Sequence, residues 1–312
     1  MDPYQRRFGG VARLFGSEGL KRLRRAHVCV VGVGGVGSWA VEALARSGVS
    51  QLTLIDLDDV CISNVNRQIH ALDGELGKPK VEIMARRVAA INPDCVVNPL
   101  HSFFLKSNAD EILQTPFDAV VDAIDSPSLK CVLIAACHAR NIPIVTTGAA
   151  GGRQDPTAIE VIDLAFSSGD RLLQEVRKKL RKNYAFPRGD QAFGVECVLS
   201  REPPAYPTRE GCVSFHRAEA ADLRLDCTSG FGTASFVTGT FGLVAASRIV
   251  QRIASKASEG ESPTAEGRNP VRCDDAAVRQ EEIRPVTIEG PHGERPRAES
   301  SFNVARGSQR GA

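Results

Sequence analysis

The chain has 312 residues, of which 42% are apolar and 5% aromatic, and it carries a net charge of +2. This composition permits a soluble enzyme of one large domain or two domains, with a core built mainly from aliphatic side chains. The nine cysteines follow no regular spacing, and the first 25 residues contain no signal-like apolar run. These features argue against a disulfide framework and indicate a cytoplasmic protein.

The first half of the chain alternates between strand and helix patterns. His27–Val31 and Gln51–Ile55 are short apolar runs typical of buried strands, and Val36–Ser47 between them has the pattern of a helix. The apolar residues of Lys80–Ile91 recur at helical spacing. Further elements are predicted at Val96-Val97, Ala119–Ala123, Leu129–Arg140 (a helix) and Ile142–Thr146. This alternation predicts an α/β fold with a Rossmann-like, doubly wound, mostly parallel sheet that binds its ligand at the carboxyl ends of the strands.

Beyond Gly152 the alternation becomes less regular. We expect a strand at Ala158–Asp163, a basic helix at Asp170–Lys182 and a strand at Phe193–Leu199. Phe231–Ile253 is apolar and about long enough to cross a membrane, but its many small residues favour a helix buried against the core. We therefore expect no stable membrane association, with attachment through residues 230–250 as the alternative. From Ser255 onward the polar, Pro-rich composition predicts a disordered tail over residues 255–312.

A glycine-rich loop follows the first predicted strand. Gly32, Gly34 and Gly37 form a Gly-x-Gly-x-x-Gly pattern that also contains Gly35, and Asp56 ends the second strand. Glycines in this pattern let the backbone approach a phosphate, and an acid about 20 residues later commonly binds a ribose hydroxyl. The pattern indicates a nucleotide site, but it does not distinguish ATP from a nicotinamide cofactor.

Charged residues after the glycine loop favour ATP. A nicotinamide enzyme has little use for Arg67 and Lys80, because helix amides already bind a diphosphate. A triphosphate that is about to be split needs cations on its phosphates and usually a carboxylate for magnesium. Asp122 and Asp125 close a later predicted strand and offer such carboxylates. The sequence therefore predicts an enzyme that uses ATP and magnesium.

Several motifs occur together in this chain: the glycine loop, Asp56, Ser63–Gln68, Gly77–Lys80 and Asp122–Asp125. Together they resemble the adenylation fold of the ubiquitin-activating-enzyme-like superfamily. Four further runs most resemble the tRNA threonylcarbamoyladenosine dehydratases within it, namely Arg7–Gly10, Asn66–His70, Thr146–Gly152 and Asp226–Gly232. The resemblance covers roughly residues 6–254, so we predict a ThiF-type adenylation domain over residues 1–254, with a nucleotide-binding core at about 26–152 and a C-terminal extension.

The resemblance implies roles for particular residues. The nucleotide would be bound by Gly32, Gly34, Gly35, Gly37, Asp56, Asn64, Asn66, Arg67 and Lys80. Arg67 and Lys80 would also be catalytic through contacts with the phosphates. Asp125 would be linked to magnesium through ATP, with Asp122 as the alternative. Lys78 is expected to be a solvent-exposed neighbour of Lys80.

Two more residues acquire roles from the resemblance. Arg7 of one subunit would enter the nucleotide site of the other, which implies a homodimer; a flexible basic N-terminus is the alternative. Cys227 would be a catalytic thiol, as in related activators that transfer an acyl group to a cysteine. Because a free cysteine is more often a small buried apolar residue, both Cys227 and Cys197 also fit a packing role. Sulfur-transfer proteins are partners suspected for some family members.

Two functions follow from the resemblance. The first is the ATP-dependent dehydration, or cyclisation, of threonylcarbamoyladenosine in tRNA through an acyl-adenylate. The alternative is an adenylyltransferase that activates the C-terminus of a sulfur-carrier or ubiquitin-like protein, but many such enzymes bind zinc with two Cys-x-x-Cys pairs, and this sequence contains none. A basic cluster in residues 171–188 fits a tRNA contact or a solvated helix face. Its central members are Arg177, Lys178, Lys179, Arg181 and Lys182.

Overall fold

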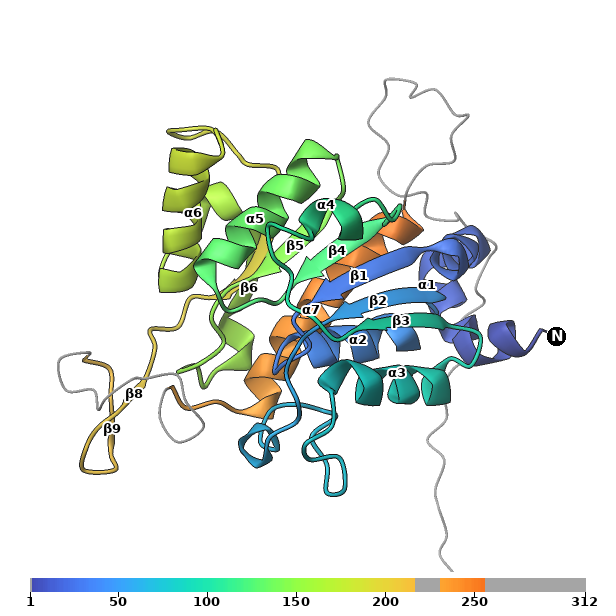
Figure 1. Ribbon diagram of the computed structural model, residues 1–312, viewed down its shortest axis with the longest axis horizontal. Coiled ribbons are helices and arrows are strands. Elements are labelled where there is room, and N and C mark those ends of the chain that lie inside the picture. The colour runs from blue at the N-terminus through green and yellow to red at the C-terminus, as the bar shows by residue number, and fades with distance from the viewer. Residues whose placement is uncertain (1, 217–230, 256–312) are drawn as a thin grey trace, which may run out of the picture. The chain divides into compact units, whose positions relative to one another are not determined.

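One seven-stranded sheet organises the chain, with helices on both of its faces (Figure 1). The computed structural model describes residues 2–216 and 231–255. The strands lie in the order β3-β2-β1-β4-β5-β7-β6, and within this sheet β6 alone runs antiparallel to its neighbour. Their bounds are β1 His27–Val31, β2 Gln51–Ile55, β3 Val96–Leu100, β4 Ala119–Asp122, β5 Ile144–Thr147, β6 Ile159–Asp163 and β7 Glu196–Ser200. The predicted doubly wound, mostly parallel sheet is confirmed.

The central strands are buried on both faces, which explains their continuous apolar sequences. In β1, Val28 and Val30 belong to one hydrophobic core with residues of α2, α3 and α7, whereas Cys29 and Val31 belong to a second core with residues of α5 and α6. The helices are α1 Pro3–Arg25, α2 Gly37–Arg46, α3 Lys80–Ile91, α4 Ala109–Ile112, α5 Pro127–Ala139, α6 Arg171–Asn183 and α7 Ser235–Ala254. Shorter elements are the 3-10 helices η1 Ile62–Asn64, η2 Pro156–Ala158 and η3 Leu164–Phe166, and the small hairpin of β8 Tyr206–Pro207 and β9 Val213–Ser214.

The apolar C-terminal helix is buried against the core, as its small residues predicted. α7 packs closely on α2: a Cβ atom at Gly242 would lie 2.3 Å from the carbonyl oxygen of Val36, and Gly239 lies against the ring of Trp39. A larger residue at position 242 would force the two helices apart. Among the described residues, no helix is long and apolar enough to cross a membrane.

The N-terminal segment is helical, which contradicts the alternative of a flexible basic N-terminus. Its arginines and glycines suggested a flexible arm as one alternative, but residues 3–25 form α1. The Tyr4 hydroxyl donates a hydrogen bond to the carbonyl oxygen of Gly48, and Phe8 is buried beside it. Tertiary contacts therefore stabilise α1. The predicted tail lies outside the described residues except for Ser255, so the division of the chain at residue 254 stays a prediction.

Candidate active site

The residues predicted to bind a nucleotide follow neighbouring strands at one edge of the sheet. The glycine loop follows β1, Asp56 follows β2, and Asp125 comes shortly after β4. Because these three strands are adjacent and parallel, their carboxyl ends lie side by side. The order of strands reverses between β1 and β4, and such a switch point is where open α/β sheets bind ligands.

The glycines of the loop are required for different physical reasons. Gly32 has a φ of 87°, and a Cβ atom there would lie 2.7 Å from the carbonyl oxygen of Ala123. A Cβ atom on Gly37 would lie 1.8 Å from the carbonyl oxygen of Gly32. These two glycines permit the turn and its close packing. Gly34 is open by comparison, since its nearest neighbour is the Gln68 amide at 3.8 Å, so ligand approach is least obstructed at Gly34.

Asp56 fixes the glycine loop to the end of β2. Its carboxylate accepts hydrogen bonds from the backbone N–H of Val33 at 2.6 Å and of Asp58 at 2.8 Å. Burial raises the pKa of the Asp56 carboxyl group, while the nearby Lys80 ammonium opposes that shift. The carboxylate thus lies beside the loop backbone at the place where the pattern predicts a ribose.

Lys80 begins α3 and has a carboxylate partner that sequence reasoning did not assign. Its ammonium lies 2.7 Å from the Asp58 carboxylate, and its side chain is 6% exposed whereas that of Asp58 is 60% exposed. The spacing of Asp56 and Asp58 after β2 was the available signal, but the sequence did not show which carboxylate faces the lysine. Lys78 is exposed and pairs with Glu75, as expected for a residue outside the site.

Arg67 lies over the glycine loop on a hydrogen-bonded backbone. Its Cγ and Cδ atoms would be 3.4 Å from a Cβ atom at Gly35, and its guanidinium donates hydrogen bonds to the Ser63 carbonyl and the Asn66 side chain. The Arg67 carbonyl accepts from Trp39 Nε1 and Thr238 Oγ1. No acid pairs with Arg67 in the described parts of the chain, so no neighbouring carboxylate neutralises its charge there.

The two asparagines beside Arg67 hold the loop in shape. The Asn64 side chain accepts a hydrogen bond from the backbone N–H of Cys61, and the Asn66 amide donates to the backbone and side chain of Thr233. Asn66 thereby connects the Arg67 loop to the segment that leads into α7. Whether either asparagine also contacts a nucleotide stays a prediction.

The two candidate magnesium acids differ sharply in accessibility. Asp125 is exposed, and its side chain has no hydrogen bond or ion pair within residues 2–216 and 231–255. Asp122 is completely buried and forms an ion pair with Lys130. Asp125 is therefore the accessible carboxylate of this pair, and its link to magnesium stays a prediction.

Arg7 lies far from the nucleotide edge of its own chain. Its guanidinium donates a hydrogen bond of 3.4 Å to the carbonyl oxygen of Ile91, at the C-terminal end of α3. Lys80 is at the other end of that helix, and eleven residues at 1.5 Å each separate the two ends by about 16 Å. The described fold thus does not bring Arg7 to its own nucleotide site.

The predicted cysteines do not form a described catalytic centre. Cys227 lies outside the described residues, so its role stays a prediction. Cys197 is fully buried in β7, and burial raises the pKa of its thiol far above the ordinary range. Cys197 therefore has a packing role. In the described ranges, no three His, Cys, Asp or Glu side chains cluster to hold a metal ion.

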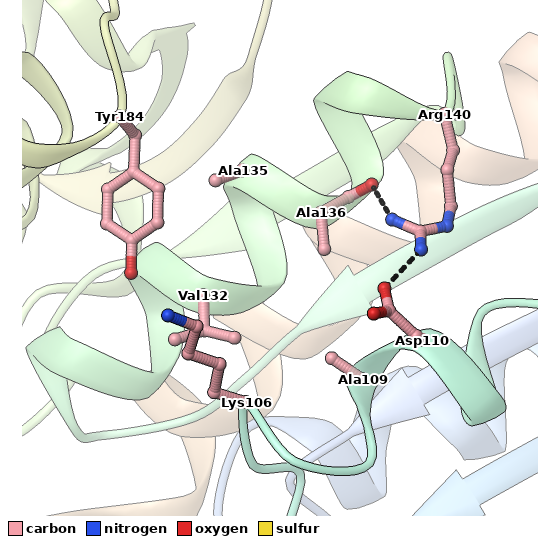
Figure 2. A pocket seen from close by; sticks show the side chains of 8 residues that line it. All are labelled: Lys106, Ala109, Asp110, Val132, Ala135, Ala136, Arg140 and Tyr184. Atoms are coloured by element: carbon pink, nitrogen blue, oxygen red, sulfur yellow. Dashed lines mark hydrogen bonds and ion pairs between the residues drawn. The ribbon is translucent and has the colours of Figure 1, made fainter.

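A separate shallow pocket of 250 Å³ lies between α4 and α5 (Figure 2). The Arg140 guanidinium at its rim binds the Asp110 carboxylate and the Ala136 carbonyl, and Lys106 and Tyr184 lie at another side. None of the predicted site residues lines this pocket. It is distinct from the nucleotide edge.

His70 is buried near Lys80 and gives a pH-dependent prediction. It is 1% exposed, and neither ring nitrogen has a hydrogen-bond partner among the residues that the structure describes. Burial, with Lys80 and Arg87, lowers its pKa to about 4. In the unfolded chain the pKa of this histidine is about 6.5. Between pH 6.5 and pH 4 the unfolded state therefore binds a proton that the folded state does not bind, and stability falls as the pH falls. We expect a loss of about 2 kcal/mol of unfolding free energy between pH 7.5 and pH 5.

The variant His70→Leu should lack this contribution in denaturant titrations at the two pH values. His138→Gln is the control, because His138 is exposed and its replacement should retain the pH dependence of the wild type. Equal pH dependence in His70→Leu and the wild type would contradict the buried neutral state of His70.

Known proteins are similar to this chain along most of its length. The ThiF family model matches residues 4–273. The tRNA threonylcarbamoyladenosine dehydratase of Haemophilus influenzae is 45% identical over 83% of this chain and 97% of that protein, and its Escherichia coli counterpart is 46% identical over 82% and 97%. The crystal structure of the E. coli enzyme in complex with ATP has a TM-score of 0.72 at 43% identity, covering 81% of this chain and 96% of that one.

The adenylyltransferase relatives share less of the chain. The molybdopterin-synthase adenylyltransferase of Salmonella typhimurium is 39% identical over 45% of this chain and 55% of that protein. The H. influenzae and E. coli dehydratases, in contrast, match along nearly their whole length. The chain therefore belongs to the ThiF family.

Proposed function

We propose that this protein dehydrates threonylcarbamoyladenosine in tRNA, in a reaction that consumes ATP. The observation that carries the proposal is 45–46% identity to tRNA threonylcarbamoyladenosine dehydratases over 97% of their length. The nucleotide edge supports it, since Asp56, Arg67, Lys80 and Asp125 follow the strand ends around the glycine loop. The partial match to molybdopterin-synthase adenylyltransferase supports a shared adenylation step but not that enzyme's substrate.

The chemistry has two steps. The carboxylate of the threonyl group attacks the α-phosphate of ATP, which gives an acyl-adenylate and releases pyrophosphate. The carbamoyl group of the same nucleoside then attacks the activated carbonyl, closes a ring and expels AMP, so that one water is lost overall. Because the second step is intramolecular, positioning and charge neutralisation are sufficient and no protein nucleophile is required. Cys227 is then not needed as a nucleophile.

Lys80 and Arg67 act on the phosphates in this proposal. Lys80 exchanges the exposed carboxylate of Asp58 for a phosphate oxygen at the edge of the sheet. Arg67 keeps its backbone position, which Trp39 and Thr238 fix, and turns its guanidinium, which no acid among the described residues pairs with, toward the triphosphate.

The site offers magnesium one carboxylate ligand from the protein. Asp125 offers one exposed carboxylate, and magnesium bound to ATP commonly takes only one or two carboxylates beside phosphates and water. When bound, the ion would neutralise negative charge on the phosphates. Asp125 would hold it, and Asp122 would not, because Lys130 already pairs with that buried carboxylate.

A homodimer would complete the site. Arg7 lies at the wrong end of α3 to serve its own chain, so a second copy would have to supply this arginine. Exposed apolar side chains at η1 and at the start of α7 support such a partner: Ile62 is 65% exposed, Val65 53% and Phe236 58%. The hydrogen bond between Asn66 and Thr233 brings these two segments together, and exposed apolar surface of this kind is typical of an interface.

The decisive experiment is mass spectrometry of anticodon-loop nucleosides after tRNA is incubated with protein and ATP. We expect threonylcarbamoyladenosine to be replaced by a product lighter by one water, and no change without ATP. Unmodified tRNA should not stimulate pyrophosphate release. If both tRNAs stimulate release equally and no dehydrated nucleoside forms, the tRNA substrate is wrong and a sulfur-carrier protein becomes the better candidate.

The basic surface of α6 is smaller than the sequence suggested. Arg177 donates to the Ala165 carbonyl, and Arg181 donates to the Pro187 and Gly189 carbonyls while it lies over the Phe193 ring. Lys179 donates to Ser128. The exposed cations of the helix are Arg171, Lys178 and Lys182. These three are the better candidates for contacts with tRNA phosphates.

Replacing Arg171, Lys178 and Lys182 together with Ala should raise the KM for tRNA and flatten its salt dependence, because each phosphate contact adds about 0.7–0.9 to the salt slope. The KM for ATP should stay within twofold. A control triple variant removes three exposed cations elsewhere, Arg46, Lys78 and Arg86. Steady-state kinetics at several salt concentrations test this, and equal changes in the two variants would mean that α6 makes no specific tRNA contact.

A further inference from the structure

A fully buried polar cluster lies beneath the nucleotide edge, and the proposed reaction does not use it directly. Lys130 and Asp122 are each 0% exposed, and the ammonium lies 3.0 Å from the Asp122 carboxylate. The same ammonium donates to Thr146 Oγ1 at 3.1 Å and to the Asp122 carbonyl at 3.3 Å. Thr146 Oγ1 in turn donates to the Asp122 carboxylate at 2.6 Å. The ammonium therefore has two hydrogen bonds and one ion pair inside the cluster.

The ion pair in this cluster is not expected to add much to the free energy of unfolding. Removing two charges from water is expensive, and apolar residues of similar volume in place of a buried ion pair are often neutral or stabilising. The Lys130 cluster nevertheless joins three separate elements, since Asp122 ends β4, Thr146 is in β5 and Lys130 is in α5. Such a network specifies one relative arrangement of those elements.

The same network holds the turn of residues 122–125, which follows β4 and ends at Asp125. The Asp122 carboxylate also accepts a hydrogen bond from the backbone N–H of Ile124 at 3.1 Å. On its other side the turn packs against the glycine loop, because a Cβ atom on Gly32 would lie 2.7 Å from the Ala123 carbonyl oxygen. The turn is thus held between the ion pair and the glycine loop, and its last residue is the exposed Asp125.

We propose that Lys130 is a positioning residue: through Asp122 and Thr146 it fixes the turn that presents Asp125 to magnesium-bound ATP. The inference rests on the proposed ATP and magnesium site and does not depend on the tRNA substrate. The proposal thus connects the exposed carboxylate of Asp125 to the buried Lys130, which would not itself contact the ligand.

The test compares ATP binding with and without magnesium by calorimetric titration. The double variant Lys130→Met/Asp122→Asn removes both charges together, so that no unpaired charge stays buried. We expect its magnesium-free ATP affinity to stay within threefold of the wild type, and the gain in affinity caused by magnesium to shrink at least tenfold. Thr146→Val removes one hydroxyl and should shrink that gain about threefold, while Thr146→Ser should restore it.

Thr53→Val is the matched control. Thr53 is a buried threonine of the same sheet whose hydroxyl bonds to His27 and not to the turn. It should lose as much thermal stability as Thr146→Val but keep the full magnesium effect. Unchanged magnesium dependence in Thr146→Val, or the same loss in Thr53→Val, would reduce Lys130 to a structural role. Wild-type protein that binds no ATP would instead overturn the proposed site itself, and this inference with it.

Discussion

Lys80→Ala is expected to slow ATP-dependent pyrophosphate release at least 100-fold while the fold stays intact. The ammonium lies at the carboxyl edge of the sheet, where its present partner is the exposed carboxylate of Asp58. A preorganised donor that meets charge developing in the transition state contributes about 3 kcal/mol, which corresponds to about 100-fold in rate. Single-turnover assays of pyrophosphate release at saturating ATP measure this loss directly.

Lys78→Ala is the matched control for Lys80→Ala. It removes the same charge two residues earlier, but Lys78 is exposed and pairs with Glu75 at the surface. Its rate should stay within threefold of the wild type. A Lys80→Ala protein that folds normally by circular dichroism and releases pyrophosphate within threefold of the wild type would show that Lys80 does not act on the phosphates.

Arg67→Ala should cause a loss of similar size for the same electrostatic reason. Alanine loses the guanidinium's hydrogen bonds to the Ser63 carbonyl and the Asn66 side chain, but it retains the backbone carbonyl that Trp39 and Thr238 contact. The variant therefore removes the guanidinium while the contacts from Trp39 and Thr238 continue to hold the loop backbone.

The fold could be predicted from the sequence because its strands are buried on both faces. In β1 and β2 every residue after the first is buried, so each strand appears as a short apolar run between helical patterns. α1 could not be predicted in the same way. Its arginines and glycines interrupt the apolar pattern of a helical face, and Tyr4 is buried by a contact with Gly48, 44 residues away.

The candidate site shows the same division. Asp56, Lys80 and Asp125 could be found from local spacing, because each lies at a strand end or a helix start. Their partners could not be found, since the Lys80–Asp58 pair spans 22 residues and depends on where α3 begins relative to β2. The alternation of strands and helices contains no information about whether Asp56 or Asp58 pairs with Lys80.

The separation of Arg7 from its own nucleotide edge leads to the second large expected effect. Arg7→Ala and Arg67→Ala should each be nearly inactive alone, and mixing the two proteins should restore about one quarter of the wild-type activity. Random exchange makes about half of the dimers mixed, and in a two-fold symmetric dimer one of the two sites then has both arginines. Pyrophosphate release after subunit exchange is the measurement.

A mixture of Lys80→Ala and Arg67→Ala is the control for that experiment. Both residues belong to the nucleotide edge of one chain, so every site in the mixed dimer lacks one of them and no activity should return. Recovery in the Arg7 mixture and none in this control would place Arg7 in the partner's site. If neither mixture recovers although native mass spectrometry shows that mixed dimers have formed, Arg7 does not act across the interface. The hydrogen bond between Arg7 and Ile91 would then be a local contact at the end of α3.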